Sequence, residues 1–123
     1  MKVRDVASSA VVAVGPAQSL REAAQLMAKH RVGSAVVQDA ESLIGILTER
    51  DVLNAVAAAD DPETVSVEQL MTADVVTVGP DWDLIEAAKV MASRRIRHLV
   101  VYDGGQLLGV LSVRDVLPAV LPE

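Results

Sequence analysis

The sequence predicts an α/β fold, of the α+β type, made of two pseudo-symmetric copies of one small β-α-β-β-α unit. Three observations lead to this prediction. Residues 11–56 align with residues 75–120 at a constant offset of 64, without a gap and with about half of the positions identical. Each half alternates short β-type runs with apolar stripes of helical spacing. A half of about 60 residues would be marginal alone, so the two halves of this 123-residue chain should share a core.

The first half begins with a short β-type run at residues 11–14, which a Gly-Pro pair stops. Ser19 and Glu22 follow in a capping-box pattern, in which each side chain can accept a hydrogen bond from the backbone N–H of the other. Apolar residues then recur at i, i+3, i+4 and i+7 from Leu20, as on one face of a helix. The sequence therefore predicts a strand followed by a helix.

Two strands and a second helix complete the first half. The strands are expected at residues 35–37 and 43–47, separated by a polar turn, and Thr48 opens the helix. Gly104 and Gly105, between the last two expected strands of the second half, are typical of a tight hairpin turn. The second half repeats the same order, with a strand at 75–78, a helix from Asp83, strands at 99–102 and 107–111, and a helix after Ser112.

The expected domain boundaries follow the repeat: residues 1–60 form the first unit, 61–66 a linker and 67–123 the second unit. Three acidic residues in four, at 60–63, could suggest a metal loop. The spacing and the glycine of a calcium loop are missing, so a solvated linker is favoured and no metal site is expected. Pro118 should kink or shorten the last helix, because proline removes a backbone donor.

Composition excludes several classes of protein. The chain has no cysteine, so it can form neither a disulfide framework nor a thiolate metal site. No apolar run approaches the roughly 18 residues that span a membrane, and the N-terminus lacks the apolar stretch of a signal peptide, so a soluble cytoplasmic protein is expected. The net charge of −6 argues against a general surface for a nucleic acid polymer. The 51% of hydrophobic residues favours self-association that covers apolar surface.

Catalysis is not expected. The sequence lacks a cysteine nucleophile, paired catalytic carboxylates in an apolar setting, and a Ser-His-Asp arrangement with supporting motifs. His98 is the only plausible acid or base. The prediction is therefore a binding module with no catalytic residues.

The strongest signals are two seven-residue motifs, Gly45-Ile46-Leu47-Thr48-Glu49-Arg50-Asp51 and Gly109-Val110-Leu111-Ser112-Val113-Arg114-Asp115. Both contain a glycine, two apolar residues, Thr or Ser, two variable residues and Asp. On these motifs, and on segments 67–72 and 96–101, the chain resembles a tandem cystathionine-β-synthase (CBS) domain pair, or Bateman module, over essentially its whole length. Val36 and Val100 depart from the family pattern, since many members carry proline there. That departure concerns strand geometry more than the choice of ligand.

The resemblance implies two β-α-β-β-α units packed through their sheets, with a central cleft between them. Members commonly bind adenosine-containing ligands there, such as AMP, ADP, ATP, S-adenosylmethionine or NAD-type dinucleotides, as regulators and not as required cofactors. Members also tend to form flat homodimers through their helices. The resemblance thus implies a regulatory module that senses an adenine nucleotide and signals through a change of conformation or association, read out by an effector protein.

The side chains of each motif suit such a ligand. The aspartate could accept two hydrogen bonds from ribose hydroxyls, and the arginine could contact a phosphate in bidentate fashion. The Thr or Ser precedes a helix N-terminus, whose free N–H groups favour a phosphate. The spacing of Thr or Ser to Asp equally fits a simple helix cap, and both roles can coexist. Gly45 and Gly109 leave room on a strand for a ligand or a backbone segment.

By analogy with nucleotide-binding members, two unequal clefts are expected. The first would contain Ser112, Arg114, Asp115, Arg97 and His98, with Val12 and Val32 around the base. The second would contain Thr48, Arg50 and Asp51, with Val76 and Ile96 around the base. The positions of Arg97 and His98 hold Gly33 and Ser34 in the second cleft. We therefore expect the first cleft to prefer phosphorylated ligands, and the second a weaker or less charged ligand, or none.

Two further expectations concern surfaces. Arg94 and Arg95 are interpreted as a solvated helix end, where cations are favoured by the helix dipole. The alternative function is an unliganded homodimeric scaffold or protein-interaction module with empty clefts. The apolar helices at 51–56 and 115–121 favour self-association under either function.

Overall fold

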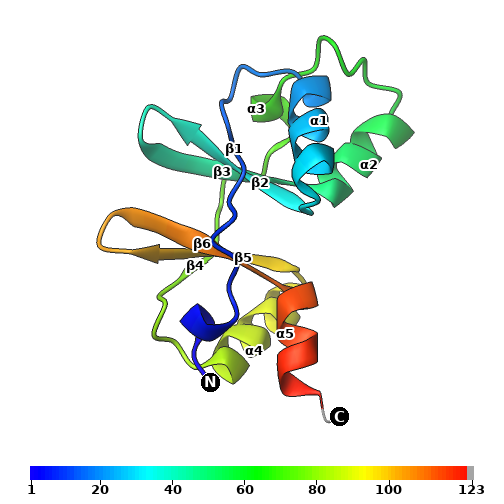
Figure 1. Cartoon of the computed structure of the whole chain (residues 1–123). Coiled ribbons are helices and arrows are strands. Elements are labelled where there is room, and N and C mark those ends of the chain that lie inside the picture. Colours follow the sequence, from blue (N-terminus) through cyan, green and yellow to red (C-terminus); the bar gives the residue numbers. More distant parts are fainter. Residues whose placement is uncertain (122–123) are drawn as a thin grey trace. The chain divides into compact units, whose positions relative to one another are not determined.

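The computed structural model of the chain describes residues 1–121, which form two three-stranded sheets with their own helices (Figure 1). The chain divides into two units that do not follow the sequence repeat. One unit, the continuous unit, consists of residues 12–75. The other, the divided unit, combines residues 1–11 with the chain from residue 76 onward.

The continuous unit contains six elements: β1 (Ala13–Val14), α1 (Leu20–His30), β2 (Ser34–Asp39), β3 (Ser42–Thr48), α2 (Glu49–Ala57) and α3 (Val67–Leu70). Strand β1 pairs in parallel with β2, and β2 pairs antiparallel with β3. Beside the predicted order of elements, the structure adds α3, which directly follows the expected linker.

The divided unit repeats this topology. It contains η1 (Val3–Asp5), β4 (Thr77–Val78), α4 (Leu84–Arg94), β5 (His98–Asp103), β6 (Gln106–Ser112) and α5 (Val113–Val120). Strand β4 is parallel to β5, and β5 is antiparallel to β6. The mixed α/β fold with a β-α-β-β-α order in each half is therefore confirmed. The first strand of each half is shorter than expected, with two residues in place of four.

Local sequence signals account for several element ends. The Ser19 hydroxyl accepts a hydrogen bond from the Glu22 N–H at 3.1 Å, and Glu22 accepts one from the Ser19 N–H at 3.4 Å, so the predicted capping box begins α1. Gly104 and Gly105 both have positive φ angles, 56° and 83°, as a tight hairpin turn between antiparallel strands requires. Pro118 lies inside α5, which has eight residues where α2 has nine. The helix continues past Pro118 to Val120, so the expected kink or shortening stays a prediction.

Each unit has its own cluster of buried apolar residues. In the divided unit, the cluster contains Val3, Val78, Leu84, Ala87, Met91, Leu99, Val101, Leu111 and Val116. In the continuous unit, it contains Val12, Val14, Ala23, Met27, Ala35, Val37, Leu47 and Val67. Val3 and Val67 both have 0% exposure. Val3 lies just before the first repeat but is buried with the second, and Val67 lies just before the second repeat but is buried with the first. Each cluster therefore contains a valine from the segment that precedes the other repeat, while a core common to both halves stays a prediction.

We call these preceding segments the N-terminal strap (residues 1–9) and the internal strap (residues 65–73). The N-terminal strap donates from the Val3 N–H to the Trp82 carbonyl at 2.9 Å. The internal strap donates in the same way from the Val67 N–H to the Gln18 carbonyl at 2.9 Å.

No helix within residues 1–121 combines the length and the apolar character needed to cross a membrane.

Candidate functional site

Each seven-residue motif covers the end of a strand and the first turn of the next helix. Strand β3 ends at Thr48, which is the N-cap of α2, and β6 ends at Ser112, which is the N-cap of α5. The neighbouring strand begins directly opposite these caps, because Ser34 pairs with Thr48 and His98 pairs with Ser112. The polar end of each motif therefore lies at the same end of its sheet as the start of β2 or β5.

The carboxylate of Asp51 caps α2 together with Thr48. Its Oδ2 accepts hydrogen bonds from the Thr48 N–H at 2.8 Å and from the Thr48 hydroxyl at 3.1 Å. The Asp51 N–H donates to Thr48 Oγ1 at 3.4 Å. The capping interpretation of this spacing is confirmed. Both bonds from Thr48 fall on Oδ2, so capping leaves Oδ1 of this half-buried side chain able to accept from a ligand hydroxyl.

At α5 of the divided unit, the carboxylate of Asp115 accepts the equivalent two hydrogen bonds from Ser112. Asp115 Oδ2 accepts from the Ser112 N–H at 3.2 Å and from the Ser112 hydroxyl at 3.0 Å. The two capping bonds again share one carboxylate oxygen. Both motif aspartates thus have a structural role, which a ligand contact through the other oxygen would add to and not replace.

The predicted phosphate-binding residues of the divided unit lie beside the start of α5. The Val113 N–H, at the first residue of α5, donates to the Arg97 carbonyl at 3.0 Å. His98 follows as the first residue of β5 and is half-buried, while the side chains of Arg97 and Arg114 are exposed. The structure therefore brings Arg97, His98, Ser112, Arg114 and Asp115 to one end of one sheet.

The continuous unit builds the same backbone with different charges. The Glu49 N–H donates to the Gly33 carbonyl at 3.0 Å, which repeats the bond between Val113 and Arg97. Gly33 brings no side chain to this end of the sheet, and Ser34 is a buried hydroxyl with 7% exposure. Only Arg50 carries a positive charge among the predicted residues of this unit. The expected difference in charge between the two motif sites is therefore present in the geometry of each unit.

The net charges of the two units differ in the same direction. Residues 12–75 contain four basic and ten acidic residues, a net charge of −6. The residues of the divided unit contain seven of each sign, so they carry no net charge. By its own net charge, the divided unit repels an anion less than the continuous unit does.

The four apolar residues predicted to surround a base fall into two pairs. Val12 and Val32 pack with the apolar cluster of the continuous unit. Val76 and Ile96 pack against the cluster of the divided unit. Each pair belongs to a different unit from the motif that it was predicted to serve, and both assignments stay predictions.

The motif glycines make room for backbone. A Cβ atom on Gly109 would overlap the Ser8 carbonyl oxygen and lie 3.2 Å from its carbon. A Cβ atom on Gly45 would lie 3.0 Å from the Thr72 carbonyl oxygen and would overlap the Met71 side chain. Of the two alternatives that the sequence left open, ligand or backbone, the structure shows a strap backbone at both glycines.

Sequence reasoning missed the straps. The repeat offset of 64 extends into them, since it relates Val3 to Val67, and these two residues carry the buried contact of each strap. An alignment that begins at residue 11 does not include this signal.

The CBS domain model matches residues 3–58 and 67–122 of the chain. Similar proteins include a 17.7 kDa protein of Acidianus ambivalens, which is 37% identical over 98% of this chain and 73% of its own length. The CBS domain-containing protein YhcV of Bacillus subtilis is 35% identical over 92% of this chain and 81% of its own length. An inosine-5′-monophosphate dehydrogenase of Korarchaeum cryptofilum is 37% identical over 86% of this chain, but over only 21% of the enzyme.

Solved structures of similar proteins cover nearly the whole chain. The CBS-domain containing protein ATU1752 of Agrobacterium tumefaciens has a TM-score of 0.90 and 35% identity, over 98% of this chain and 93% of its own. The CBS domain protein PAE2072 of Pyrobaculum aerophilum, complexed with AMP, has a TM-score of 0.85 and 31% identity, over 94% and 89%. The CBS domain pair of MJ0100, in complex with 5′-methylthioadenosine and S-adenosyl-L-methionine, has a TM-score of 0.88 and 25% identity, over 97% and 94%.

Proposed function

The chain belongs to the CBS domain family as a tandem pair, and from this premise we propose that it is a regulatory module that binds an adenosine nucleotide and responds by changing conformation or association. The observation that carries the proposal is the grouping of Arg97, His98, Ser112, Arg114 and Asp115 at the start of α5. Two related proteins, at 31% and 25% identity, are complexed with AMP or with sulfur-containing adenosine compounds.

Each side chain of this group has a distinct role in the proposal. Asp115 accepts a hydrogen bond from a ribose hydroxyl on Oδ1, the carboxylate oxygen that does not bind Ser112. Arg97 and Arg114 contact the phosphate groups, with the N-terminus of α5 supplying further donors. His98 adds a hydrogen bond at the phosphate end. Val12 and Val32 are proposed to flank the base.

The motif of the continuous unit is proposed to bind a less charged ligand more weakly, or to remain empty. Thr48 and Asp51 offer the same hydroxyl and carboxylate as the other motif, and Arg50 offers one cation. Gly33 and Ser34 bring no charge, and the unit around them is acidic. Val76 and Ile96 would flank the base here, and a neutral or sulfonium-containing adenosine compound suits this site better than a triphosphate.

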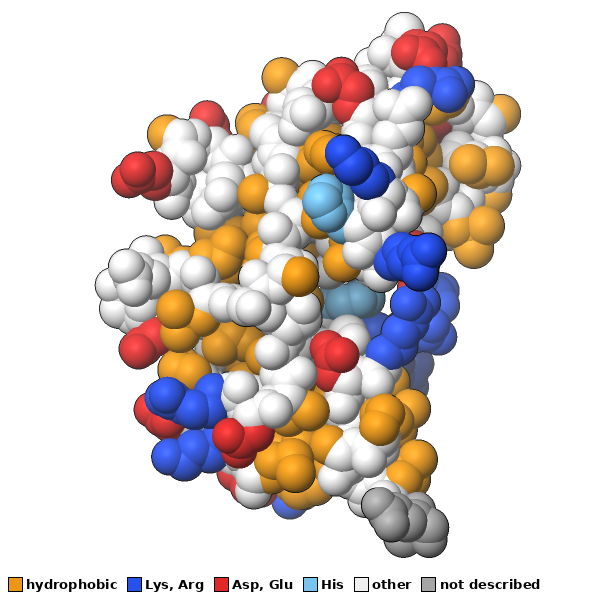
Figure 2. Space-filling view, in the orientation of Figure 1, with side chains coloured by type: hydrophobic (Ala, Val, Ile, Leu, Met, Phe, Trp, Pro, Cys, Tyr) orange, Lys and Arg blue, Asp and Glu red, His pale blue; other side chains and the backbone are white. Residues whose placement is uncertain are grey.

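The helices that follow the two motifs are proposed to form a homodimer interface. Leu53 and Val56 on α2 are 66% and 68% exposed, and Leu117 and Val120 on α5 are 47% and 39% exposed. Figure 2 shows apolar side chains, in orange, at the surface in the regions of α2 and α5. The same residue types occupy equivalent positions in both repeats although half of the aligned positions differ. Exposed leucine and valine side chains at these positions are typical of an interface.

Catalysis by the chain is not part of the proposal. The match to inosine-5′-monophosphate dehydrogenase covers about a fifth of that enzyme, so its activity does not transfer to this chain. The second candidate function is a scaffold without a ligand, which the exposed apolar faces of α2 and α5 also favour.

A thermal-shift panel with AMP, ADP, ATP, S-adenosylmethionine, NAD and GTP tests the two functions. A ligand at 100 times its dissociation constant should stabilise the fold by about 2.7 kcal/mol, a shift of several degrees. We expect a shift with at least one adenosine compound, and no shift with GTP. A panel without any shift would favour the scaffold.

Calorimetric titration of Asp115→Ala and Asp51→Ala then assigns the site. Both variants lose a helix cap, so Glu22→Ala, which loses the equivalent cap of α1, is the matched control. We expect Asp115→Ala to lose nucleotide binding, and Asp51→Ala and Glu22→Ala to retain it. Equal binding by all three variants would contradict the proposed site.

A further inference from the structure

Backbone hydrogen bonds join both ends of the N-terminal strap to the rest of the divided unit. At one end, the Leu84 N–H at the start of α4 donates to the Met1 carbonyl at 2.9 Å. At the other end, Ser8 and Val110 exchange two backbone hydrogen bonds, each of 3.0 Å, so the strap adds a short edge to β6. These bonds join a segment that precedes the first repeat to elements of the second repeat.

Two apolar features complete the seat of this strap. Val3 is fully buried in the cluster that also contains Leu84, Leu99 and Leu111. Gly109 leaves the face of β6 open, so the Ser8 carbonyl can approach the strand. A side chain at position 109 would prevent this approach. The glycine of the motif is therefore required by strap docking.

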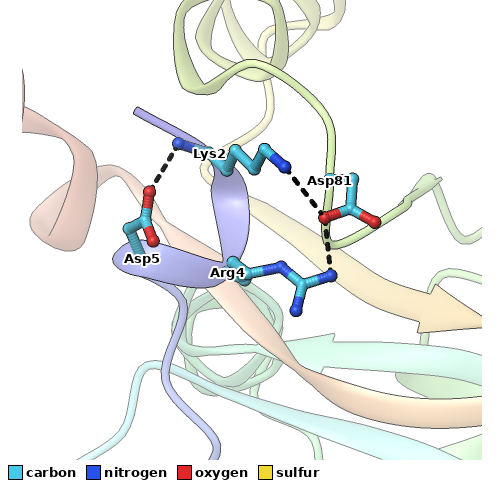
Figure 3. A network of polar contacts seen from close by, with 4 residues as sticks. All are labelled: Lys2, Arg4, Asp5 and Asp81. Carbon is cyan, nitrogen blue, oxygen red and sulfur yellow. Dashed lines mark hydrogen bonds and ion pairs between the residues drawn. The ribbon is translucent and has the colours of Figure 1, made fainter.

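An ion-pair network holds the outer face of the N-terminal strap (Figure 3). Arg4 Nη2 lies 2.5 Å from Asp81 Oδ1, and Lys2 Nζ lies 3.5 Å from the same oxygen. The hydrogen bond from Arg4 lowers the pKa of the Asp81 carboxyl, which therefore stays ionised. The equivalent positions, 66 and 68 in the internal strap and 17 before α1, hold Ser, Glu and Ala, which cannot form this network. The ion pairs of Lys2 and Arg4 with Asp81, which we call the ionic clamp, therefore have no equivalent at these positions of the continuous unit.

The strap and the proposed ligand site share one strand. Val110, which pairs with Ser8, lies two residues before Ser112, a distance of about 7 Å along β6. Ser112, the N-cap residue of α5, in turn donates from its N–H and its hydroxyl to the Asp115 carboxylate. Only Leu111 separates Val110 from the Ser112 N–H, which the Asp115 carboxylate binds.

We propose that docking of the N-terminal strap and occupancy of the Ser112–Asp115 site are linked equilibria. The docked strap holds the end of β6 in the register that places Ser112 and Asp115 for a nucleotide. A bound nucleotide in turn retains the strap, because linkage between two binding equilibria is reciprocal. Occupancy of this site then changes the surface of the protein by changing the docking of the strap. This inference rests on the proposed nucleotide binding.

Hydrogen exchange of the full chain, measured by mass spectrometry with and without AMP, ADP or ATP, tests the linkage. We expect a nucleotide that gives binding heat to slow exchange of the amides of residues 1–9 by about fivefold or more, the lower end of typical coupling between sites. The internal strap, residues 65–73, is the internal reference and should change less. Binding heat without any slowing in residues 1–9 would overturn the linkage and leave nucleotide binding intact. No heat with any of the three nucleotides would overturn both.

Reversing the charge of Asp81 tests the linkage in the opposite direction, from strap docking to nucleotide affinity. Asp81→Lys should repel Lys2 and Arg4, speed exchange of residues 1–9 and raise the dissociation constant of the nucleotide by about fivefold. Asp103→Lys, at the exposed end of β5, makes the same change of net charge outside the ion-pair network and is the matched control. It should stay within about twofold of the unchanged chain. Equal dissociation constants, or equal exchange of residues 1–9, in the two variants would contradict the inference.

Discussion

Ser8 and Val110 exchange two backbone hydrogen bonds of 3.0 Å although one residue precedes the first repeat and the other lies in the second. The pair explains why a glycine stands at position 109, immediately before Val110. The equivalent pair in the continuous unit, Ile46 and Thr72, also exchanges two bonds, each of 2.9 Å, beside Gly45. Each motif glycine therefore marks the seat of a strap, and each sheet is completed by a segment from the other sequence repeat.

Gly109→Ala should lower the free energy of unfolding by about 1–3 kcal/mol, the usual cost of forcing an added group into a packed site. The new Cβ would overlap the Ser8 carbonyl, which is backbone and cannot rotate away. Urea unfolding measures the change. Gly15→Ala is the control, because its Cβ would meet only Gln18 Oε1 at 4.0 Å, and it should change the free energy by less than about 0.5 kcal/mol. Equal losses in the two variants would contradict the role assigned to Gly109.

The pH dependence of stability should contain a contribution from Asp81. The hydrogen bond from Arg4 lowers the pKa of this carboxyl in the folded protein, whereas the unfolded chain keeps an ordinary value of about 3.9. A lowered folded pKa gives stability that is present above the unfolded pKa and is lost as the pH falls through the folded pKa. The difference in stability between the unchanged chain and Asp81→Asn should therefore shrink below about pH 4.

Urea unfolding between pH 3 and pH 7 measures this difference. It should also shrink in high salt, because Asp81 and its partners are exposed and screened by ions. Asp103→Asn, at the end of β5, gives the reference for an exposed aspartate. A difference that is constant over the whole pH range would show that the ion pair with Arg4 does not contribute.

Local patterns were sufficient to predict much of the fold, because helix caps and tight turns depend on residues a few positions apart. The capping box of Ser19 and Glu22 is present as predicted. Gly104 and Gly105 have positive φ angles. A Gly-Gly pair favours this kind of tight turn between two strands. The same reasoning predicted that Thr48 and Asp51 could cap a helix, and they do.

The straps could not be predicted from local patterns. The contact of Ser8 with Val110 joins residues far apart in the chain. Neither strap contains an alternating apolar pattern long enough to predict a strand, so the sequence does not indicate which strand it pairs with. The first strand of each half was expected to have four residues, yet only the second two pair in a regular sheet. The preceding residues lie where the chain passes from one unit to the other, at 11–12 and 75–76. This path is a long-range property of the fold.

Replacing Arg95 by glycine should raise stability by about 0.5–1 kcal/mol. Arg95 ends α4 in a left-handed conformation, with φ 56°, which glycine adopts without steric cost. Arg31 ends α1 in the same way, with φ 55°, so Arg31→Gly should have the same sign. Thermal unfolding measures both variants. Ala92→Gly, inside α4, should instead cost about 1 kcal/mol, and a loss of stability in all three variants would contradict this account.

Exchanging two residues between the repeats tests the origin of the proposed preference for phosphate. Arg97→Gly combined with His98→Ser gives the divided unit the residues that the continuous unit carries at 33 and 34. Hydrogen bonds to charged groups contribute about 1.5–3 kcal/mol, so we expect the affinity for AMP to fall at least tenfold. Adenosine lacks the phosphate, and its affinity should change by less than about threefold. Calorimetric titration of both compounds measures the ratio, and Arg94→Gly, a charge loss in the last turn of α4, is the control. A similar loss of affinity for AMP and adenosine would mean that the exchange disturbed the whole site, and it would remove Arg97 and His98 from the phosphate contact.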